Sequence, residues 1–169
     1  MPAAHFTMGG IEIDGDGFTG KEGLFAAGEA TCGLHGANRM GGNALSETLV
    51  FGNRAGRAAA IYAKSHKLPG ISAVEPGSRP ARGEGLSPLA LLDQLKRNVW
   101  THCGPVRTTA GLEEGISFVE AVGREDVRCR NAVDAAWAVM LGNAIDTART
   151  IFEAAIAHKS SIGAHYREG

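Results

Sequence analysis

The chain contains 169 residues, 44% of them hydrophobic and 21% charged, which is enough apolar material for one domain of ordinary size or for one small domain and part of another. Its formal net charge of −1 at pH 7 argues against a general nucleic-acid-binding protein, whose affinity depends on excess Lys and Arg. No run of about 18 apolar residues is present, and residues 1–20 lack the basic start and apolar segment of a secretory signal.

The first third of the chain is rich in glycine and contains the expected strands. Thirteen of the 24 glycines fall within residues 1–56, which indicates turns and close backbone approach in that region. Alternation over residues 11–13 predicts a strand, followed by a turn at 14–17. The apolar run at residues 24–27 predicts a buried strand. A glycine-rich loop is expected at residues 33–42.

A helix is expected at residues 44–64, with Asn43 as its N-cap and its end at residues 68–70 (Leu-Pro-Gly). Four residues at spacings of three to four predict one face on which another element packs closely, namely Leu45, Leu49, Gly52 and Gly56. Proline, glycine and serine then concentrate in residues 69–87, so we place a linker at residues 67–85.

Three further helices are expected after this linker. The first begins at Ser87-Pro88 and stops at Gly104-Pro105, the second covers residues 110–122 with Gly123 as its C-cap, and the third covers residues 131–159. Their apolar stripes are Leu91, Leu92, Leu95 and Val99, then Leu112, Ile116, Val119 and Val122, then Val133, Trp137, Met140, Leu141, Ala144 and Ile145. Short connections between them predict an antiparallel three-helix bundle, so the fold class is α+β.

Three charged side chains could form a site for anions and polyols. A glycine-rich loop leading into a helix presents free backbone N–H groups and the positive end of the helix dipole. Arg39 lies in this loop and suits a carboxylate, His5 could donate to a second carboxylate oxygen, and Glu29 could accept from hydroxyl groups. Each also has a structural reading, as a loop-stabilising histidine, an ion-paired arginine or a turn-capping glutamate.

The cysteines give no sign of a metal site or a disulfide framework. Cys32, Cys103 and Cys129 are odd in number and widely spaced, and no second His or Cys lies at zinc spacing from His35. We therefore expect no metal, and a reducing, cytoplasmic location is the simplest interpretation.

Five blocks of the sequence resemble the flavoprotein subunit of succinate dehydrogenase and fumarate reductase, a superfamily that includes L-aspartate oxidase. They are HFTMGGI (5–11), GLFAAGE (23–29), HGANRMGGNALSETLVFGNRAG (35–56), WTHCGPVR (100–107) and GAHYRE (163–168). The resemblance implies FAD as cofactor and hydride transfer between flavin N5 and a dicarboxylate carbon. It implies substrate contacts from His5 and Arg39, a flavin contact from Glu29, and close approach of the Ala44 and Leu45 backbone to the flavin.

The chain departs from the family pattern in ways that affect activity. Ala44 stands where the family usually has Ser, and Ile162 stands where Arg is expected. No G-x-G-x-x-G motif follows a strand, and the family's proton-donating arginine lies in an upstream region that is absent here, so no catalytic residue is assigned. Residues 1–66 are expected to be the C-terminal portion of an FAD-binding and substrate domain. Residues 86–169 are expected to be the helical C-terminal domain of the flavoprotein.

The isolated chain is therefore expected to be inactive and not to retain FAD. Its expected partners are the missing N-terminal half, fumarate or succinate, further copies of itself, and an iron–sulfur subunit. Any membrane association would come through other subunits. Two alternatives stay open, an L-aspartate oxidase-like fragment and a non-catalytic helical interaction module.

Overall fold

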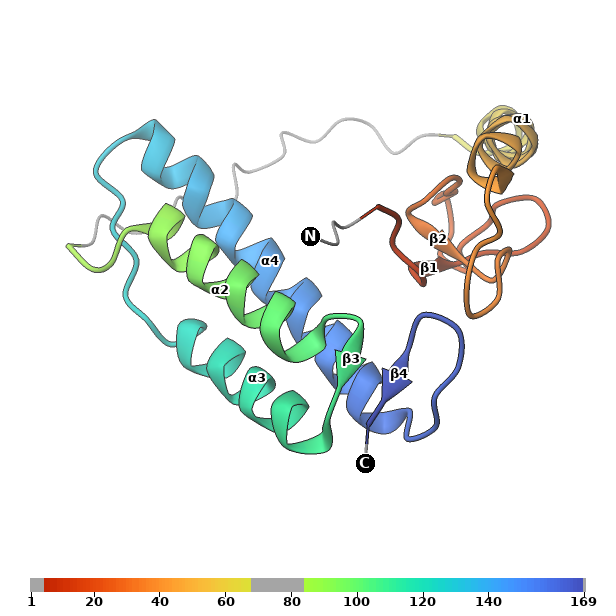
Figure 1. Cartoon of the computed structure of the whole chain (residues 1–169). Helices are drawn as coiled ribbons and strands as arrows, with labels where there is room; N and C mark the ends of the chain where they lie inside the picture. The colour runs from red at the N-terminus through yellow and green to blue at the C-terminus, as the bar shows by residue number, and fades with distance from the viewer. Residues whose placement is uncertain (1–4, 68–83, 169) are drawn as a thin grey trace. The chain divides into compact units, whose positions relative to one another are not determined.

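The computed structural model describes residues 5–67 and 84–168, and these two ranges belong to two compact units (Figure 1). Helices and short strands occur in both units, in agreement with the expected α+β class. The expected linker at 67–85 and the expected helix end at 68–70 lie almost entirely outside the described residues. Within the described ranges, no helix is both long and apolar enough to cross a membrane.

The strands of the first unit differ from the expectation. β1 (Ile11–Glu12) pairs in parallel with β2 (Thr31–Cys32), with Ile11 opposite Thr31. The buried strand expected at residues 24–27 is wrong. This segment forms one arm of a hairpin, bridged between Phe18 and Phe25, and its Leu24 is 47% exposed. Gly23 and Gly28 adopt the left-handed conformation on either side of this segment, which prevents a strand from continuing in either direction.

Helix α1 (Asn43–Ser65) begins without a side-chain cap. Its N-cap is Gly42, with φ 86°, and no side chain accepts a hydrogen bond from the first backbone N–H groups. The expectation that Asn43 caps this helix is therefore wrong by one residue, because Asn43 is already the first helical residue. The first turn also contains no acidic side chain.

The packed face of α1 is also different from the expected one. Leu45 and Leu49 are 77% and 75% exposed, and a Cβ at Gly52 or Gly56 would find no described atom within 4 Å. The helix instead buries Glu47 and Ala55 against the loops of the first unit. Its hydrophobic periodicity identified an apolar face correctly, but that face is not the one packed in this chain.

The second unit is built around three helices that pack against one another, α2 (Pro88–Cys103), α3 (Thr109–Val122) and α4 (Ala132–Ala157). Their N-caps are Ser87, Thr108 and Asn131, each accepting backbone N–H groups of the first turn. The expected start at Ser87-Pro88 and the expected C-cap at Gly123 are confirmed.

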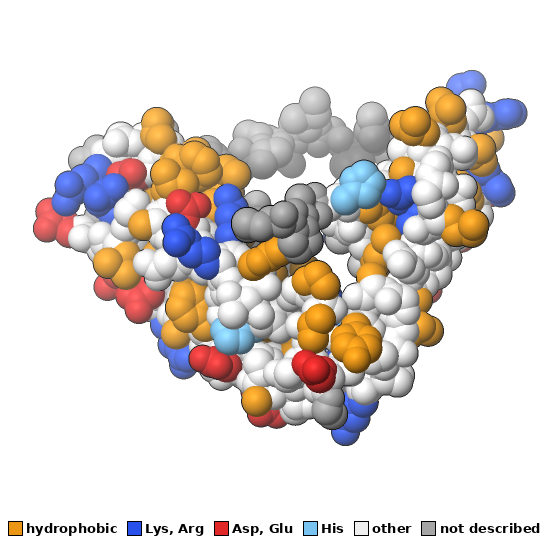
Figure 2. All heavy atoms as spheres, viewed as in Figure 1, with side chains coloured by type: hydrophobic (Ala, Val, Ile, Leu, Met, Phe, Trp, Pro, Cys, Tyr) orange, Lys and Arg blue, Asp and Glu red, His pale blue; other side chains and the backbone are white. Residues whose placement is uncertain are grey.

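One hydrophobic core joins the three helices. The expected inward positions are buried at Leu91, Leu92, Leu95, Leu112, Val119, Val122, Leu141 and Ile145. Two expected inward residues are wrong, because Val133 is 63% and Met140 51% exposed. Apolar side chains stay exposed on both units (Figure 2). Of the buried hydrophobic residues in the described ranges, all but Ala55 belong to the second unit.

A second pair of short strands, not expected from the sequence, closes the second unit. β3 (Val106–Arg107) and β4 (Tyr166–Arg167) pair in parallel. Arg107 donates from Nη1 to His165 Nδ1 at 2.6 Å, and His165 donates from Nε2 to the carbonyl of His158 at 2.9 Å. The guanidinium of Arg167 donates to the carbonyl of Ala155, also at 2.9 Å. These contacts hold the segment after α4 against the segment that follows α2.

Candidate functional site

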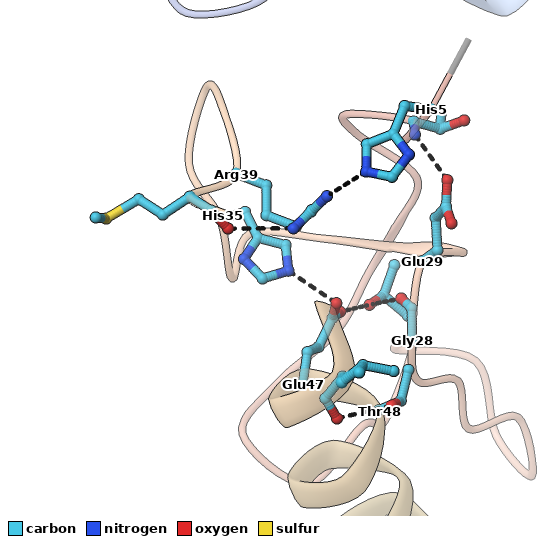
Figure 3. Close-up of polar contacts among 11 residues, drawn as sticks. His5, Gly28, Glu29, His35, Arg39, Glu47 and Thr48 are labelled. Atoms are coloured by element: carbon cyan, nitrogen blue, oxygen red, sulfur yellow. Dashed lines mark hydrogen bonds and ion pairs between the residues drawn. The ribbon is translucent and has the colours of Figure 1, made fainter. Parts of the chain in front are cut away.

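Three segments of the first unit meet where the sequence places its candidate residues: the segment after His5, the turn at residues 28–31, and the loop that leads from His35 into α1 (Figure 3). Glycine permits the closest of these approaches. At Gly10, with φ +141°, an added Cβ would overlap the carbonyl oxygen of Ala30, while the neighbouring Ile11 N–H donates to that oxygen at 2.9 Å.

The structure brings His5 and Arg39 together. Nη2 of Arg39 lies 3.2 Å from Nε2 of His5, although the two residues are 34 positions apart (Figure 3). Arginine only donates hydrogen bonds, so in this contact Nε2 of His5 accepts and the neutral ring carries its proton on Nδ1. Arg39 also donates from Nη1 to the carbonyl of Met40 at 3.1 Å.

Phe6 supports the Arg39 guanidinium from one side. The guanidinium carbon lies 4.3 Å from the centroid of the Phe6 ring, within the range of a cation–π interaction. Nε of Arg39 is shielded from solvent, and no residue that the structure describes accepts a hydrogen bond from it. The guanidinium therefore has donor capacity that the described side chains do not use.

Glu29 connects the segment of His5 to the turn after the hairpin. Its Oε1 accepts a hydrogen bond from the backbone N–H of Thr7 at 2.7 Å, while the residue itself is exposed. This contact joins two distant segments, so it differs from the capping of a neighbouring turn that the sequence left open. It occupies one of the two carboxylate oxygens, and no described residue donates to the other.

Ala44 and Leu45 lie in the uncapped first turn of α1. Ala44 is half-buried, whereas Leu45 is exposed. Because this helix start has no capping side chain and its first turn has no acidic residue, neither local group compensates the positive end of the helix dipole.

Sequence reasoning missed three residues that organise the site: Phe6, Thr31 and Glu47. Glu47 is 5% exposed and accepts at Oε2 from His35 Nε2 at 2.7 Å. The hydroxyl of Thr31 lies 3.4 Å from Oε1 of Glu47 and donates to the carbonyl of Gly28 at 2.8 Å. The only signal in the sequence was an acidic residue near the start of a helix, twelve positions after a histidine.

Comparisons with known proteins identify the family to which the chain is similar. Residues 1–45 match the family described as FAD binding domain, and residues 92–169 match the family described as fumarate reductase flavoprotein C-term. Over 183 residues the chain is 36% identical to the fumarate reductase flavoprotein subunit of Haemophilus influenzae, covering 98% of this chain and 31% of that protein. Over 168 residues it is 34% identical to L-aspartate oxidase 2 of Ralstonia nicotianae, covering 99% and 30%.

A solved structure gives the same assignment. The Sdh1 complex of Mycobacterium smegmatis in the apo form superposes with a TM-score of 0.89 at 34% identity, covering 97% of this chain and 30% of that chain. The chain is therefore of the flavoprotein class. More narrowly, it belongs to the succinate dehydrogenase and fumarate reductase flavoprotein family, which confirms the resemblance, and it matches the C-terminal part of that family. It spans about a third of the length of the curated relatives that it matches.

Proposed function

We propose that this chain is the C-terminal part of an FAD-dependent oxidoreductase that interconverts fumarate and succinate, with His5 and Arg39 as ligands of the dicarboxylate. The observation that carries the proposal is the 3.2 Å approach of Arg39 Nη2 to His5 Nε2 from two distant segments. Two nitrogen-rich side chains that converge at an accessible position suit a carboxylate better than any neutral group.

The donor geometry supports carboxylate binding. A guanidinium can present two parallel N–H groups to the two oxygens of a carboxylate, and Nη2 of Arg39 meets His5 at an exposed position. His5 presents a second donor, the Nδ1–H of its neutral ring. Phe6 holds one side of the guanidinium, so the arginine is partly oriented before a ligand arrives.

The residues present also fit a flavin at the start of α1. Ala44 and Leu45 lie in the first turn of α1, which has no side-chain cap and no acidic residue. A helix N-terminus of this kind suits the negative charge of a reduced flavin. The second carboxylate oxygen of Glu29 could accept from flavin hydroxyl groups. FAD, when bound, would supply hydride transfer; this chain's own residues hold and orient the substrate.

The proposal includes the rest of the assembly. Residues 1–66 complete an FAD-binding domain, residues 67–85 are a linker, and residues 86–169 form the antiparallel helical domain. Catalysis requires an N-terminal FAD-binding half with the proton-donating arginine, and the expected electron partner is an iron–sulfur subunit. The chain is inactive alone, self-associates through its unpartnered surfaces, and acts in the cytoplasm, peripheral to a membrane only through other subunits.

The first test is the visible absorbance of the purified chain, before and after incubation with FAD and desalting. We expect no retained flavin and no fumarate reduction with a reduced dye. Retained flavin with turnover would overturn the proposed inactivity of the isolated chain.

The substrate ligands are tested by titrating the isotope-labelled chain with fumarate and following the His5 and Arg39 resonances. Both are expected to shift in the wild type, and the His5 resonance is expected to stay fixed in Arg39→Ala. Arg54→Ala is the matched control, since Arg54 is an exposed arginine of the same unit paired with Asp16 at 3.4 Å. Equal His5 responses in the Arg39→Ala and wild-type chains would refute the substrate assignment.

An L-aspartate oxidase activity is the second candidate, because relatives with that name match at similar identity. The same titration separates the two. Fumarate is expected to shift His5 and Arg39 at lower concentration than L-aspartate, and the reverse order would favour the aspartate candidate.

A further inference from the structure

A continuous set of contacts lies behind the Arg39–His5 pair and ends on helix α1. The members of this set are Glu47, His35, Phe6 and Arg39. The carboxylate of Glu47 is 2.7 Å from His35 Nε2, the ring of His35 meets the ring of Phe6, and Phe6 carries the Arg39 guanidinium on its face (Figure 3).

The first link is a buried carboxylate. The side chain of Glu47 is 3% exposed and that of His35 is 13% exposed. A buried carboxylate is costly unless hydrogen bonds satisfy it. Glu47 therefore needs the N–H of His35, since the single Thr31 hydroxyl proton is donated to the carbonyl of Gly28 at 2.8 Å. Because a carboxylate accepts and does not donate, Nε2 of His35 must carry a proton. Glu47 thereby fixes both the protonated nitrogen and the plane of the His35 ring.

The second link is between two rings. Phe6 and His35 have centroids 5.7 Å apart and planes at 78°, an edge-to-face arrangement. This edge contact favours one orientation of the Phe6 ring. Rotation of the His35 ring would remove the contact. Phe6 in turn supports Arg39, whose guanidinium carbon is 4.3 Å from the ring centroid.

We propose that Glu47 is a positioning residue for the dicarboxylate site, acting through His35 and Phe6 to hold the Arg39 guanidinium where it meets His5. The dicarboxylate role of Arg39 rests on the proposed function, whereas the chain of contacts does not. Glu47 acts in this proposal through its contact with His35 and not by contact with the dicarboxylate. Its helix supplies a fixed end, so the loop that carries Arg39 takes its position from α1 instead of from its own glycine-rich backbone.

The test measures the Arg39 side chain directly in the 169-residue chain. Cδ of Arg39 is two bonds from Cζ, which lies 4.3 Å from the Phe6 ring centroid, so we expect the protons on Cδ to experience the ring current of Phe6. Phe6→Leu defines the chemical shift of these protons without that ring. Glu47→Leu is expected to move the Arg39 Hδ shift most of the way to the Phe6→Leu value. Glu47→Gln is expected to stay near the wild type, because its amide oxygen can still accept from His35.

Two further variants establish the route and the control. His35→Leu is expected to displace Arg39 as Glu47→Leu does, and the double variant should add nothing more, since both act on one path. Glu22→Gln is the matched control, because Glu22 faces His66 at 4.0 Å on the exposed side of the same unit. If Glu47→Leu unfolds the unit, as its backbone amide spectrum would reveal, His35→Leu decides alone. An unchanged Arg39 shift in His35→Leu, or in a folded Glu47→Leu, would overturn the proposal.

Fumarate titrations separate this inference from the proposed function. The ring-current measurement needs no ligand, so it holds whether or not the wild type binds fumarate, while absence of binding to the wild type would count against the proposed function alone. Where the wild type binds, Glu47→Leu is expected to weaken the affinity roughly tenfold, as for misalignment of one charge-assisted hydrogen bond. Unchanged affinity in the folded variant would overturn the positioning role.

Discussion

The same substitution, glycine to alanine, is expected to have opposite effects at two helical positions of the second unit. Gly115 in α3 is buried between the other two helices, and a Cβ placed there would lie 2.5 Å from Cζ of Phe152 and 2.8 Å from Cβ of His102. Gly142 in α4 is exposed, and a Cβ there would find no described atom within 4 Å. Only the surroundings differ.

The magnitudes decide the sign at each site. Alanine is about 1 kcal/mol better than glycine within a helix, and this gain applies at both positions. Overpacking a close contact costs about 1–3 kcal/mol. Phe152 has no exposed surface, and the His102 contact is to a Cβ fixed by α2, so neither neighbour can move aside without separating helices. The contacts at Gly115 are all shorter than 3 Å, so the overpacking cost there is at the upper end of this range, about 2–3 kcal/mol. After subtraction of the helix-propensity gain, we expect Gly115→Ala to destabilise the unit by about 1–2 kcal/mol. We expect Gly142→Ala to stabilise the unit by about 0.5–1 kcal/mol.

Thermal unfolding followed by tryptophan fluorescence measures this difference for the correct unit, because Trp100 and Trp137 both lie in the second unit. For a domain of this size, 1 kcal/mol corresponds to a Tm change of roughly 4–8 °C. Gly115→Ala is therefore expected to melt clearly below the wild type and Gly142→Ala above it. A Gly115→Ala chain that melts at or above the wild type would refute the packing argument.

Three further predictions concern local structure. Gly10→Ala should disrupt the contact with Ala30 and broaden or shift the amide resonances there, and an unchanged spectrum would contradict the steric argument. Burial, and then the positive charge of Arg107, lower the pKa of His165 below its usual 6.5. The unfolded chain therefore binds a proton on this ring more readily than the folded chain does. The contribution of His165 to the free energy of unfolding is fully present above pH 6.5 and is lost as the pH falls through the folded-state pKa. Unfolding midpoints measured above and below pH 6.5 test this prediction, and a rise in stability on acidification would contradict it. Asn131→Ala should lower the free energy of unfolding by about 1 kcal/mol through loss of the α4 cap, and a change near zero would exclude that role.

The helices of the second unit were predictable because each signal is local. Ser87 before Pro88, leucines at spacings of three and four, and Gly123 after Val122 all specify structure from neighbouring residues alone. The conformation of residues 24–27 was not predictable, because an apolar run cannot by itself distinguish a buried strand from an exposed hairpin arm. β3 and β4 pair residues 106 and 166, and two-residue strands have no periodicity to detect.

The candidate site was predictable in its parts but not in its arrangement. Arg39 and His5 could each be named from residue type, yet their contact across 34 positions depends on the paths of two glycine-rich loops. Glu47 was missed because the apolar spacing of Leu45 and Leu49 suggested the opposite face of α1 as the packed one. Periodicity shows that a helix has an apolar face, but it does not show which part of the protein covers that face.

The scarcity of buried apolar side chains in the first unit affects how any binding constant of this chain should be interpreted. With Ala55 as its single buried hydrophobic residue among those described, this unit has little burial to oppose local opening. The association constant measured for a site that is assembled only part of the time equals the intrinsic constant multiplied by the assembled fraction. A weak response to fumarate would then depend on the fraction of molecules in which the loops of the site are assembled, as well as on the intrinsic affinity of the assembled site. Hydrogen-exchange rates at the amides of Ile11 and Thr31, which donate to the carbonyls of Ala30 and Gly28, would measure that population independently.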